Sequence, residues 1–224
     1  MFLDQIGVPS WTPDSEESCQ AWYKYNTDQN LINDDECYEW LDQTSYNRHM
    51  VQGVDAERPT KGDGEDYLTL DSSVDQHLQL AGVTQITLDE TFTIGMRLNV
   101  DTTNGTVIGS NTTSGEIIKF ASAVNILVKI DNTARTLTST EGDFGNNRII
   151  ITRTDENLIS VYVDGALQED TAVLSGTADI NALGIRAPNT NGYDGAIYDI
   201  TIFNSASEQL TNNLEAYLQT VAPA

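Results

Sequence analysis

The sequence predicts an all-β fold in which two antiparallel sheets stack as a sandwich and one short helix follows at the C-terminus. Short apolar runs recur roughly every ten residues with turn-forming Asn, Asp and Gly between them, a pattern typical of β-sandwiches. The segment 92–168 shows no helical periodicity. A helical pattern begins only after residue 204, so strands and helices do not alternate as they do in α/β proteins.

A hairpin within residues 147–168 is the clearest local signal. Its two apolar runs cover residues 148–153 and 158–163, and a polar segment joins them. The pair Asp164 and Gly165 then supplies a second tight turn. Apolar residues recur at period two in the later run: Ile159, Val161 and Val163. We therefore expect one face of this strand to lie in the core and the other face to be mixed.

Further strands are expected on both sides of the hairpin. The longest, at residues 92–100, alternates apolar side chains on one face. Residues 193–203 carry apolar side chains on both parities, which indicates burial on both faces. Shorter strands are predicted at residues 67–70, 106–108, 116–120, 125–130, 135–139 and 183–186. Their links contain turn-forming pairs such as Asn104-Gly105 and Asp131-Asn132.

One amphipathic helix is predicted near the C-terminus. Ser205 and Glu208 have the spacing of a capping box, and Pro223 is expected to end the helix. Apolar residues then follow at helical spacing: Leu210, Leu214, Tyr217, Leu218 and Val221. This stripe predicts a helix that packs one face on the sandwich.

The 224 residues suffice for one substantial core, so a single domain is expected over residues 17–224. Residues 1–16 are rich in Pro, Asp, Ser and Glu and are predicted to form an extended N-terminal arm. The candidate assembly contacts are its isolated apolar side chains: Phe2, Leu3, Ile6 and Trp11. Two interpretations stay open: the arm lies against its own domain, or it docks on a neighbouring subunit.

The charge balance excludes some partners. The chain has 34 acidic and 11 basic residues, a formal net charge of -23. Such a field repels phosphate backbones and anionic lipid surfaces, so nucleic-acid binding is not expected. No window of the sequence is apolar enough to span a membrane, so membrane insertion is not expected either. The acidity indicates solubility in a salty or crowded medium, or alternatively attraction of cations or a basic partner. The first residues lack the basic and apolar regions of a signal peptide, so secretion by that route is not expected.

Two cysteines do not form a disulfide framework. Cys19 and Cys37 are expected to be free, buried thiols, with pairing as the alternative if two N-terminal strands lie side by side.

Three separated blocks of the chain resemble one known group of proteins. The strand pair 149–153 and 159–165, the ending 195–204 with its helix, and the opening segments 21–23 and 40–49 resemble laminin-G-like members of the concanavalin A-like lectin/glucanase superfamily. The resemblance implies a two-sheet jelly roll. One departure is Tyr46, an aromatic residue where that group often has glycine.

The resemblance also implies that calcium binding in a rim loop is possible. Asp63, Asp66 and Asp194 are the acids to inspect first, although loop aspartates are usually turn formers and none is assigned as a ligand. His49 and His77 have no Cys or His neighbour at metal-binding spacing. We therefore assign no metal site.

Catalytic chemistry is not indicated. Glycosidases of this superfamily place closely spaced carboxylates on one strand, because an acid and a nucleophile must flank one glycosidic bond. The nearest approach here is Glu141 and Asp143, which lie around Gly142 in a loop. No catalytic residue is assigned, and the protein is predicted not to be an enzyme.

The preferred functional hypothesis is a virion structural protein, a bacteriophage capsid decoration or tail-associated subunit, because laminin-G-like domains occur in phage structural proteins. It implies many copies in an assembly, other virion subunits as partners through the arm, and a location in the virion after assembly in the host cytoplasm. Host-surface glycans are further candidate partners. The first alternative is a soluble carbohydrate-binding lectin module; the second, which is disfavoured, is a glycoside hydrolase.

Overall fold

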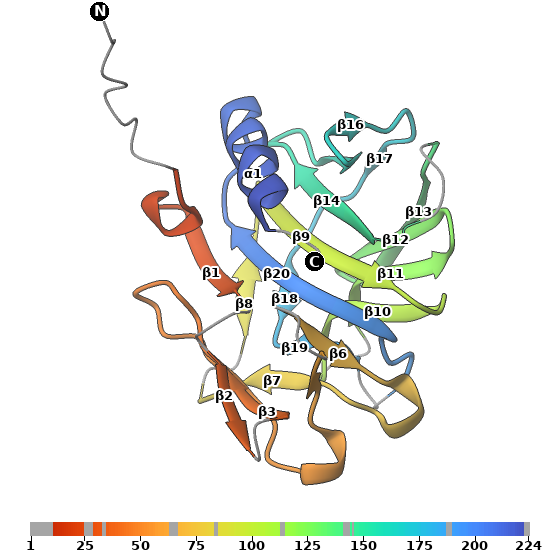
Figure 1. Cartoon of the computed structure of the whole chain (residues 1–224). Helices are drawn as coiled ribbons and strands as arrows, with labels where there is room; N and C mark the ends of the chain where they lie inside the picture. Colours follow the sequence, from red (N-terminus) through yellow and green to blue (C-terminus); the bar gives the residue numbers. More distant parts are fainter. Residues whose placement is uncertain are drawn as a thin grey trace, which may run out of the picture.

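The computed structural model describes residues 11–24, 29–32, 35–62, 67–82, 85–112, 115–140, 144, 146–186 and 190–221. It is an antiparallel two-sheet jelly roll with one C-terminal helix, as the sequence predicts (Figure 1). Within the described residues, no helix has both the length and the apolar character needed to span a bilayer.

The first sheet is built around two long central strands, β9 and β20, which pair with each other along their full length. On one side of β20 lie β1 and β6, and on the far side of β9 the hairpin strands β14 and β15 follow. The bounds are β1 (Cys19–Lys24), β6 (Leu68–Leu70), β20 (Gly195–Phe203), β9 (Phe92–Val100), β14 (Asn146–Arg153), β15 (Leu158–Val163), β16 (Ala166–Leu167) and β17 (Ala172–Val173). The short strands β16 and β17 both pair with β15 at the sheet edge.

The second sheet runs from the N-terminal hairpin to β13. In order its strands are β2 (Gln29–Ile32), β3 (Glu36–Trp40), β4 (Met50–Val51), β7 (Leu78–Leu80), β19 (Ala182–Leu183), β10 (Gly105–Ser110), β11 (Gly115–Ser122), β12 (Asn125–Ile130) and β13 (Thr133–Thr138). The short strand β5 (Thr60–Lys61) pairs with both β3 and β6 and so joins the two sheets.

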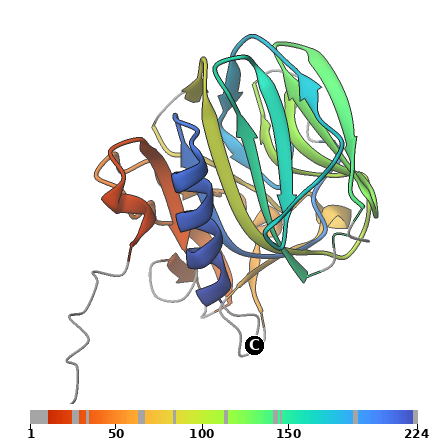
Figure 2. The same ribbon diagram turned by 90° about the horizontal axis from the view of Figure 1, so that it is seen from above.

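Smaller elements complete the fold. A separate pair is formed by β8 (Ile86–Leu88) and β18 (Ala178–Ile180), and three 3-10 turns are η1 (Pro13–Ser15), η2 (Asp55–Glu57) and η3 (Ser72–Val74). The helix α1 (Glu208–Thr220) lies on the outer side of the first sheet, against β9 and β14 (Figures 1 and 2).

The inter-sheet core is apolar and follows the predicted alternation. Every second residue of β9 is fully buried: Phe92, Ile94, Met96 and Leu98. The hairpin pairs in the predicted way, with Ile151 opposite Val161, and both side chains lie in this core. Asp164 and Gly165 both have positive φ, 50° and 83°, as a tight turn between strands requires.

A second apolar layer, the helix layer, fills the space between α1 and the first sheet. Its buried members are Cys19, Trp22, Ile150, Phe203, Leu210, Leu214 and Leu218. Gly95 of β9 allows the close approach of the helix, because a Cβ there would lie 2.6 Å from Cδ2 of Leu214. A larger side chain at this position would force the helix or Leu214 to move.

Two predictions about local structure are wrong in detail. The helix cap is not the predicted box of Ser205 and Glu208: the N-cap is Ser207, whose Oγ accepts a hydrogen bond from Leu210 N at 3.0 Å. Ser205 is instead engaged with Ser18, their Oγ atoms 2.7 Å apart, so the helix begins two residues later than that box requires. The expected strand 183–186 is also too long, since β19 ends at Leu183.

Both cysteines are free and buried, as expected. Burial raises the pKa of Cys19 and Cys37 to about 12, and for Cys19 the nearby carboxylate of Asp42 adds to this effect. At neutral pH both thiols are therefore protonated and unreactive.

Candidate functional site

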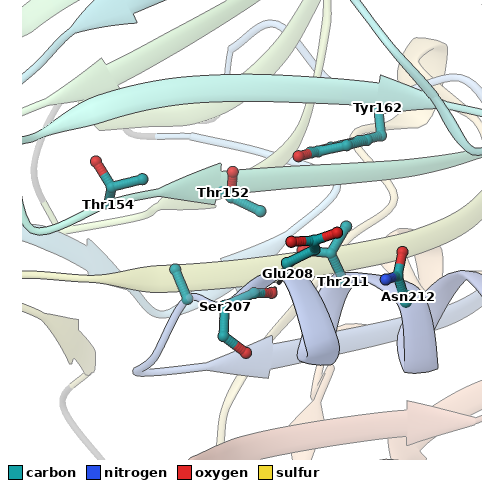
Figure 3. A pocket seen from close by; sticks show the side chains of 8 residues that line it. Thr152, Thr154, Tyr162, Ser207, Glu208, Thr211 and Asn212 are labelled. Carbon is teal, nitrogen blue, oxygen red and sulfur yellow. Dashed lines mark hydrogen bonds between the residues drawn. The ribbon is translucent and has the colours of Figure 1, made fainter.

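A groove lies between the first turns of α1 and the outer face of the hairpin strands β14 and β15. It encloses about 370 Å³, within the range of small-ligand sites, about 300 to 1,000 Å³. Its lining, shown in Figure 3, consists of Thr152, Thr154, Tyr162, Ala206, Ser207, Glu208, Thr211 and Asn212. We call it the α1 groove.

The strand side of the α1 groove follows from β alternation. Because neighbouring side chains point to opposite faces, Ile151 and Val161 enter the core while Thr152 and Tyr162 point outward. Tyr162 is opposite Ile150 in the strand register, so its ring stands beside the helix layer and is half-buried. The ring forms an aromatic wall, and its hydroxyl extends toward Thr152 (Figure 3).

The helix side of the groove comes from the first two turns of α1. Ser207 caps the helix, and Thr211 Oγ1 donates to the Ser207 carbonyl at 3.0 Å, so both hydroxyls serve the helix itself. Glu208 and Asn212 are one turn apart and therefore share a helix face. Their side chains are exposed and face the strands across the groove (Figure 3).

Five polar side chains of the groove are not engaged. Thr152, Thr154, Tyr162, Glu208 and Asn212 form no side-chain hydrogen bond or ion pair with any residue that the structure describes. Together they offer hydroxyl and amide groups that donate and accept, and one carboxylate that accepts. This is a concave surface with one aromatic wall and convergent polar groups, which suits a small polyhydroxylated ligand.

The middle of α1 is fixed to the hairpin by an ion pair with Arg148, which also pairs with Asp164. Arg148 Nε lies 2.7 Å from Glu215 Oε1, and Arg148 Nη1 lies 3.4 Å from Asp164 Oδ1. Gly165 sits against Glu215, since a Cβ there would lie 3.2 Å from Glu215 Oε1. The helix is thus fixed to the hairpin beside the α1 groove, so the two sides of the groove are already in place in this structure.

A buried acid lies under the C-terminal half of the helix. Asp199 Oδ2 accepts hydrogen bonds from Tyr217 Oη at 2.5 Å and Trp22 Nε1 at 3.1 Å, while its Oδ1 has no partner among the described residues. Burial raises the pKa of Asp199 to about 7, although the bonds from Tyr217 and Trp22 act to lower it. The burial of the Tyr217 hydroxyl and the nearby charge of Asp199 raise the pKa of Tyr217. Because Asp199 is fully buried and does not line the α1 groove, its role is structural.

Of the predicted assembly contacts, Trp11 alone falls within the described residues; Phe2, Leu3 and Ile6 lie outside them. Trp11 packs on its own domain, with its ring centroid 6.4 Å from Phe203 and 6.2 Å from Tyr217. Its Nε1 donates to Glu16 Oε1 at 2.7 Å, and η1 turns the chain before β1. The last part of the predicted arm is therefore not extended; whether the arm contacts another subunit stays a prediction.

The structure describes one of the three acids considered for calcium. Asp63 and Asp66 lie outside the described residues, and Asp194 accepts a hydrogen bond from Thr102 Oγ1 at 3.0 Å. In the part of the chain that the structure describes, no group of three His, Cys, Asp or Glu side chains is arranged to hold a metal ion. Calcium binding stays a prediction.

The remaining candidates serve the scaffold or lie outside the described residues. His49 Nδ1 accepts from the Asp42 amide at 3.0 Å, and His77 is buried beside Gln52. Glu141 and Asp143 lie outside the described residues.

Tyr46, the aromatic departure from the expected turn, is 49% exposed, and the Arg48 guanidinium lies 4.5 Å from its ring centre. It is available on the surface but does not line the α1 groove.

Sequence reasoning missed the α1 groove. The mixed outer face of the second hairpin strand was visible, but nothing in the sequence shows that α1 crosses this face beside Tyr162. Glu208 was assigned only to the helix cap and Asn212 to no role, and their distance of about fifty residues from Tyr162 in sequence hides the convergence.

No family model matches the chain, and no curated protein is similar to it in sequence. Solved structures do match. The binding domain of Paraclostridial Mosquitocidal Protein 1 aligns with 93% of this chain and 53% of that one, at 12% identity and a TM-score of 0.61. A GH54 α-L-arabinofuranosidase aligns with 83% of this chain and 51% of the arabinofuranosidase chain, also at 12% identity and a TM-score of 0.61.

The binding domain of botulinum neurotoxin DC is similar over 94% of this chain and 53% of that chain, at 13% identity and a TM-score of 0.54. The chain therefore has a two-sheet jelly-roll sandwich fold. It spans about half the length of these proteins, and at such identities the likeness establishes the fold alone. The narrower resemblance to laminin-G-like domains stays a prediction.

Proposed function

We propose that this protein is a non-catalytic, lectin-like binding module that holds a saccharide unit in the α1 groove. The observation that carries the proposal is the convergence of five unengaged polar side chains around a hollow of about 370 Å³ with Tyr162 as one wall. An aromatic wall suits the apolar face of a sugar ring, and the polar groups suit its hydroxyls.

The composition of the groove favours binding over hydrolysis. A glycosidase of the usual kind needs two carboxyl groups on opposite sides of the scissile bond. Among the described residues that line the groove, Glu208 alone carries a carboxylate. The similar arabinofuranosidase shares the fold with this chain at 12% identity, which gives no support for a shared activity.

The comparisons add modest support for a glycan ligand. The cell entry of botulinum neurotoxin type C, which is similar to this chain at 14% identity and a TM-score of 0.50, depends on interaction with two ganglioside molecules. This chain matches 52% of that structure, so the property belongs to that protein and supports only the choice of glycans, neutral and acidic alike, as the ligands to test.

A glycan array, probed with calcium and with a chelator, tests the proposal. For saccharides that bind, Tyr162→Ala is expected to weaken binding about tenfold, the equivalent of about 1.4 kcal/mol for a lost aromatic contact. Tyr46→Ala is the matched control, because Tyr46 is an exposed tyrosine outside the groove. A silent array under both conditions, or equal losses in the two variants, would reject the groove as a saccharide site.

We further propose that the module belongs to a bacteriophage virion, as a capsid decoration or tail-associated subunit. The support is the resemblance of the sequence to laminin-G-like domains and the apolar spacing of Phe2, Leu3 and Ile6 in a polar arm. Deleting residues 1–10 keeps Trp11 on its own domain, so the sandwich should fold while incorporation into particles is lost. Normal incorporation of the truncated chain would contradict this anchoring role.

A further inference from the structure

We propose that Glu208 restricts the α1 groove to neutral and amino-bearing saccharides and excludes acidic ones such as uronic acids, sialic acids and sulfated sugars. This inference rests on the proposed saccharide-binding function and names the ligand class of that site.

The position of Glu208 gives it this role. It is the first residue of α1 after the N-cap Ser207, it is exposed, and its carboxylate is turned toward the hairpin strands (Figure 3). None of the described residues forms a hydrogen bond or ion pair with it. An unpaired carboxylate accepts strong hydrogen bonds from sugar hydroxyls and from an ammonium group, and it repels another carboxylate.

No basic residue compensates for this charge within the described lining. The nearest arginines of β14 are committed elsewhere: Arg148 is paired with Glu215 and Asp164, and Arg153 is buried on the core side. The guanidinium of Arg153 donates to the carbonyls of Glu90, Leu88 and Gly176. The whole chain, with its net charge of -23, adds a negative field to that of Glu208.

The N-terminus of α1 favours acidic ligands, opposite to the effect of the Glu208 charge. Its free amides and dipole favour an anion, and an empty N-terminus would attract an acidic ligand. Here Glu208 supplies a fixed anion in the first turn. Removing its charge therefore both abolishes a repulsion and leaves the helix N-terminus available to an acidic sugar.

The test uses an array of matched oligosaccharides built from glucose, glucuronate and glucosamine, with added sialylated and sulfated glycans. It compares the natural protein with Glu208→Gln, which keeps the shape of the side chain, and with Glu156→Gln. Glu156 is exposed in the hairpin turn and does not line the groove, so its variant makes the same change in net charge. At physiological ionic strength, where charges more than about 8 Å apart are screened, local effects dominate.

The natural protein and Glu156→Gln are expected to bind neutral or amino saccharides at least about tenfold more tightly than acidic ones. Glu208→Gln is expected to bind neutral and acidic saccharides with similar affinity. Equal binding of neutral and acidic saccharides by the natural protein would overturn this inference, as would equal shifts in the two variants. If neutral and acidic saccharides bind equally well but their binding still depends on Tyr162, the role of Glu208 is rejected and the proposed saccharide-binding function survives. If no saccharide binds, the role of Glu208 and the proposed function are both rejected.

Discussion

The two apolar layers of this protein differ in kind. The inter-sheet core contains side chains such as Phe92, Ile94 and Ile151, which are fully buried and offer no polar atoms. The helix layer also buries apolar residues, but it adjoins Asp199, a fully buried acid, and Arg97, which is 4% exposed. The inter-sheet core is held mainly by apolar packing, with the Arg153 guanidinium 5.0 Å from the centre of the Phe92 ring, whereas the helix layer packs around a carboxyl group whose burial is costly.

This difference indicates how the two layers are specified. An apolar core tolerates exchange of one aliphatic residue for another, whereas hydrogen-bonded polar groups demand one arrangement of the partners. Tyr217 and Trp22 meet at Asp199 and so fix α1 and β1 relative to β20. Because α1 also forms one side of the α1 groove, we expect the polar contacts of the helix layer to position the binding surface.

The largest effect is expected from a cavity in the inter-sheet core. Phe120 is fully buried, with ring centroids 5.2 Å from Phe144 and 6.4 Å from Tyr193. Phe120→Ala should lower the free energy of unfolding by about 3 to 5 kcal/mol. In a background in which Trp40 of the inter-sheet core is replaced by Phe, tryptophan fluorescence from Trp11 and Trp22 reports on the helix layer. During urea denaturation this fluorescence and circular dichroism should shift together. Separate transitions would show that the layers unfold independently.

A smaller, pH-dependent effect is expected in the helix layer. The pKa of Asp199 is about 7 in the folded protein, against 3.8 as its ordinary value. Between these two pH values the unfolded chain has already lost the Asp199 proton while the folded protein still holds it. The free energy of unfolding therefore falls as the pH rises from about 4 to 7. Between pH 5 and pH 8 the loss should be on the order of 3 kcal/mol.

The variant Asp199→Asn should remove most of this pH dependence, because the amide keeps an acceptor for Tyr217 and Trp22 and has no charge to bury. Urea denaturation at pH 5 and pH 8 measures the difference. Asp155→Asn, at an exposed turn position, controls for the change in net charge. Should Asp199→Asn keep the pH dependence of the natural protein, the burial of Asp199 is not its source.

Much of the fold could be predicted because it depends on local alternation. The hairpin and the strand at residues 92–100 were found with nearly correct bounds, since their apolar period continues without interruption. In β20 the burial of both faces was predicted correctly, but the bulge in this strand was not. A bulge between Ile197 and Asp199 changes the parity, so Ile197, Ile200 and Ile202 all enter the inter-sheet core.

Features that depend on distant contacts were not predictable. The short strands β4, β5 and β7 have too few residues to show a period, and they exist because neighbouring strands supply their hydrogen bonds. The cap at Ser207 was misplaced because Ser205 is occupied by Ser18, which lies 187 residues earlier in the chain. The α1 groove was missed for the same reason, since its two sides come from distant segments.

The smallest effect is expected at the helix cap. Ser207→Ala removes the hydrogen bond to Leu210 N and should cost about 1 kcal/mol. Amide hydrogen exchange should accelerate in the first turn of α1 more than in β9, because the cap supports the helix end locally. Gln209→Ala, at an exposed helix position, is the control. Uniform acceleration in both elements would mean that the helix and the sandwich open only together.

The glycine at position 95 has a consequence for the width of the α1 groove. The height of α1 above the sheet depends on the absence of a side chain there, because Leu214 occupies that space. The groove opens between that helix and the hairpin, so its width follows the same height. A residue that does not line the α1 groove therefore acts as a spacer, and exchanging it offers evolution, or an engineer, a way to change the width of the groove while its lining residues stay unchanged.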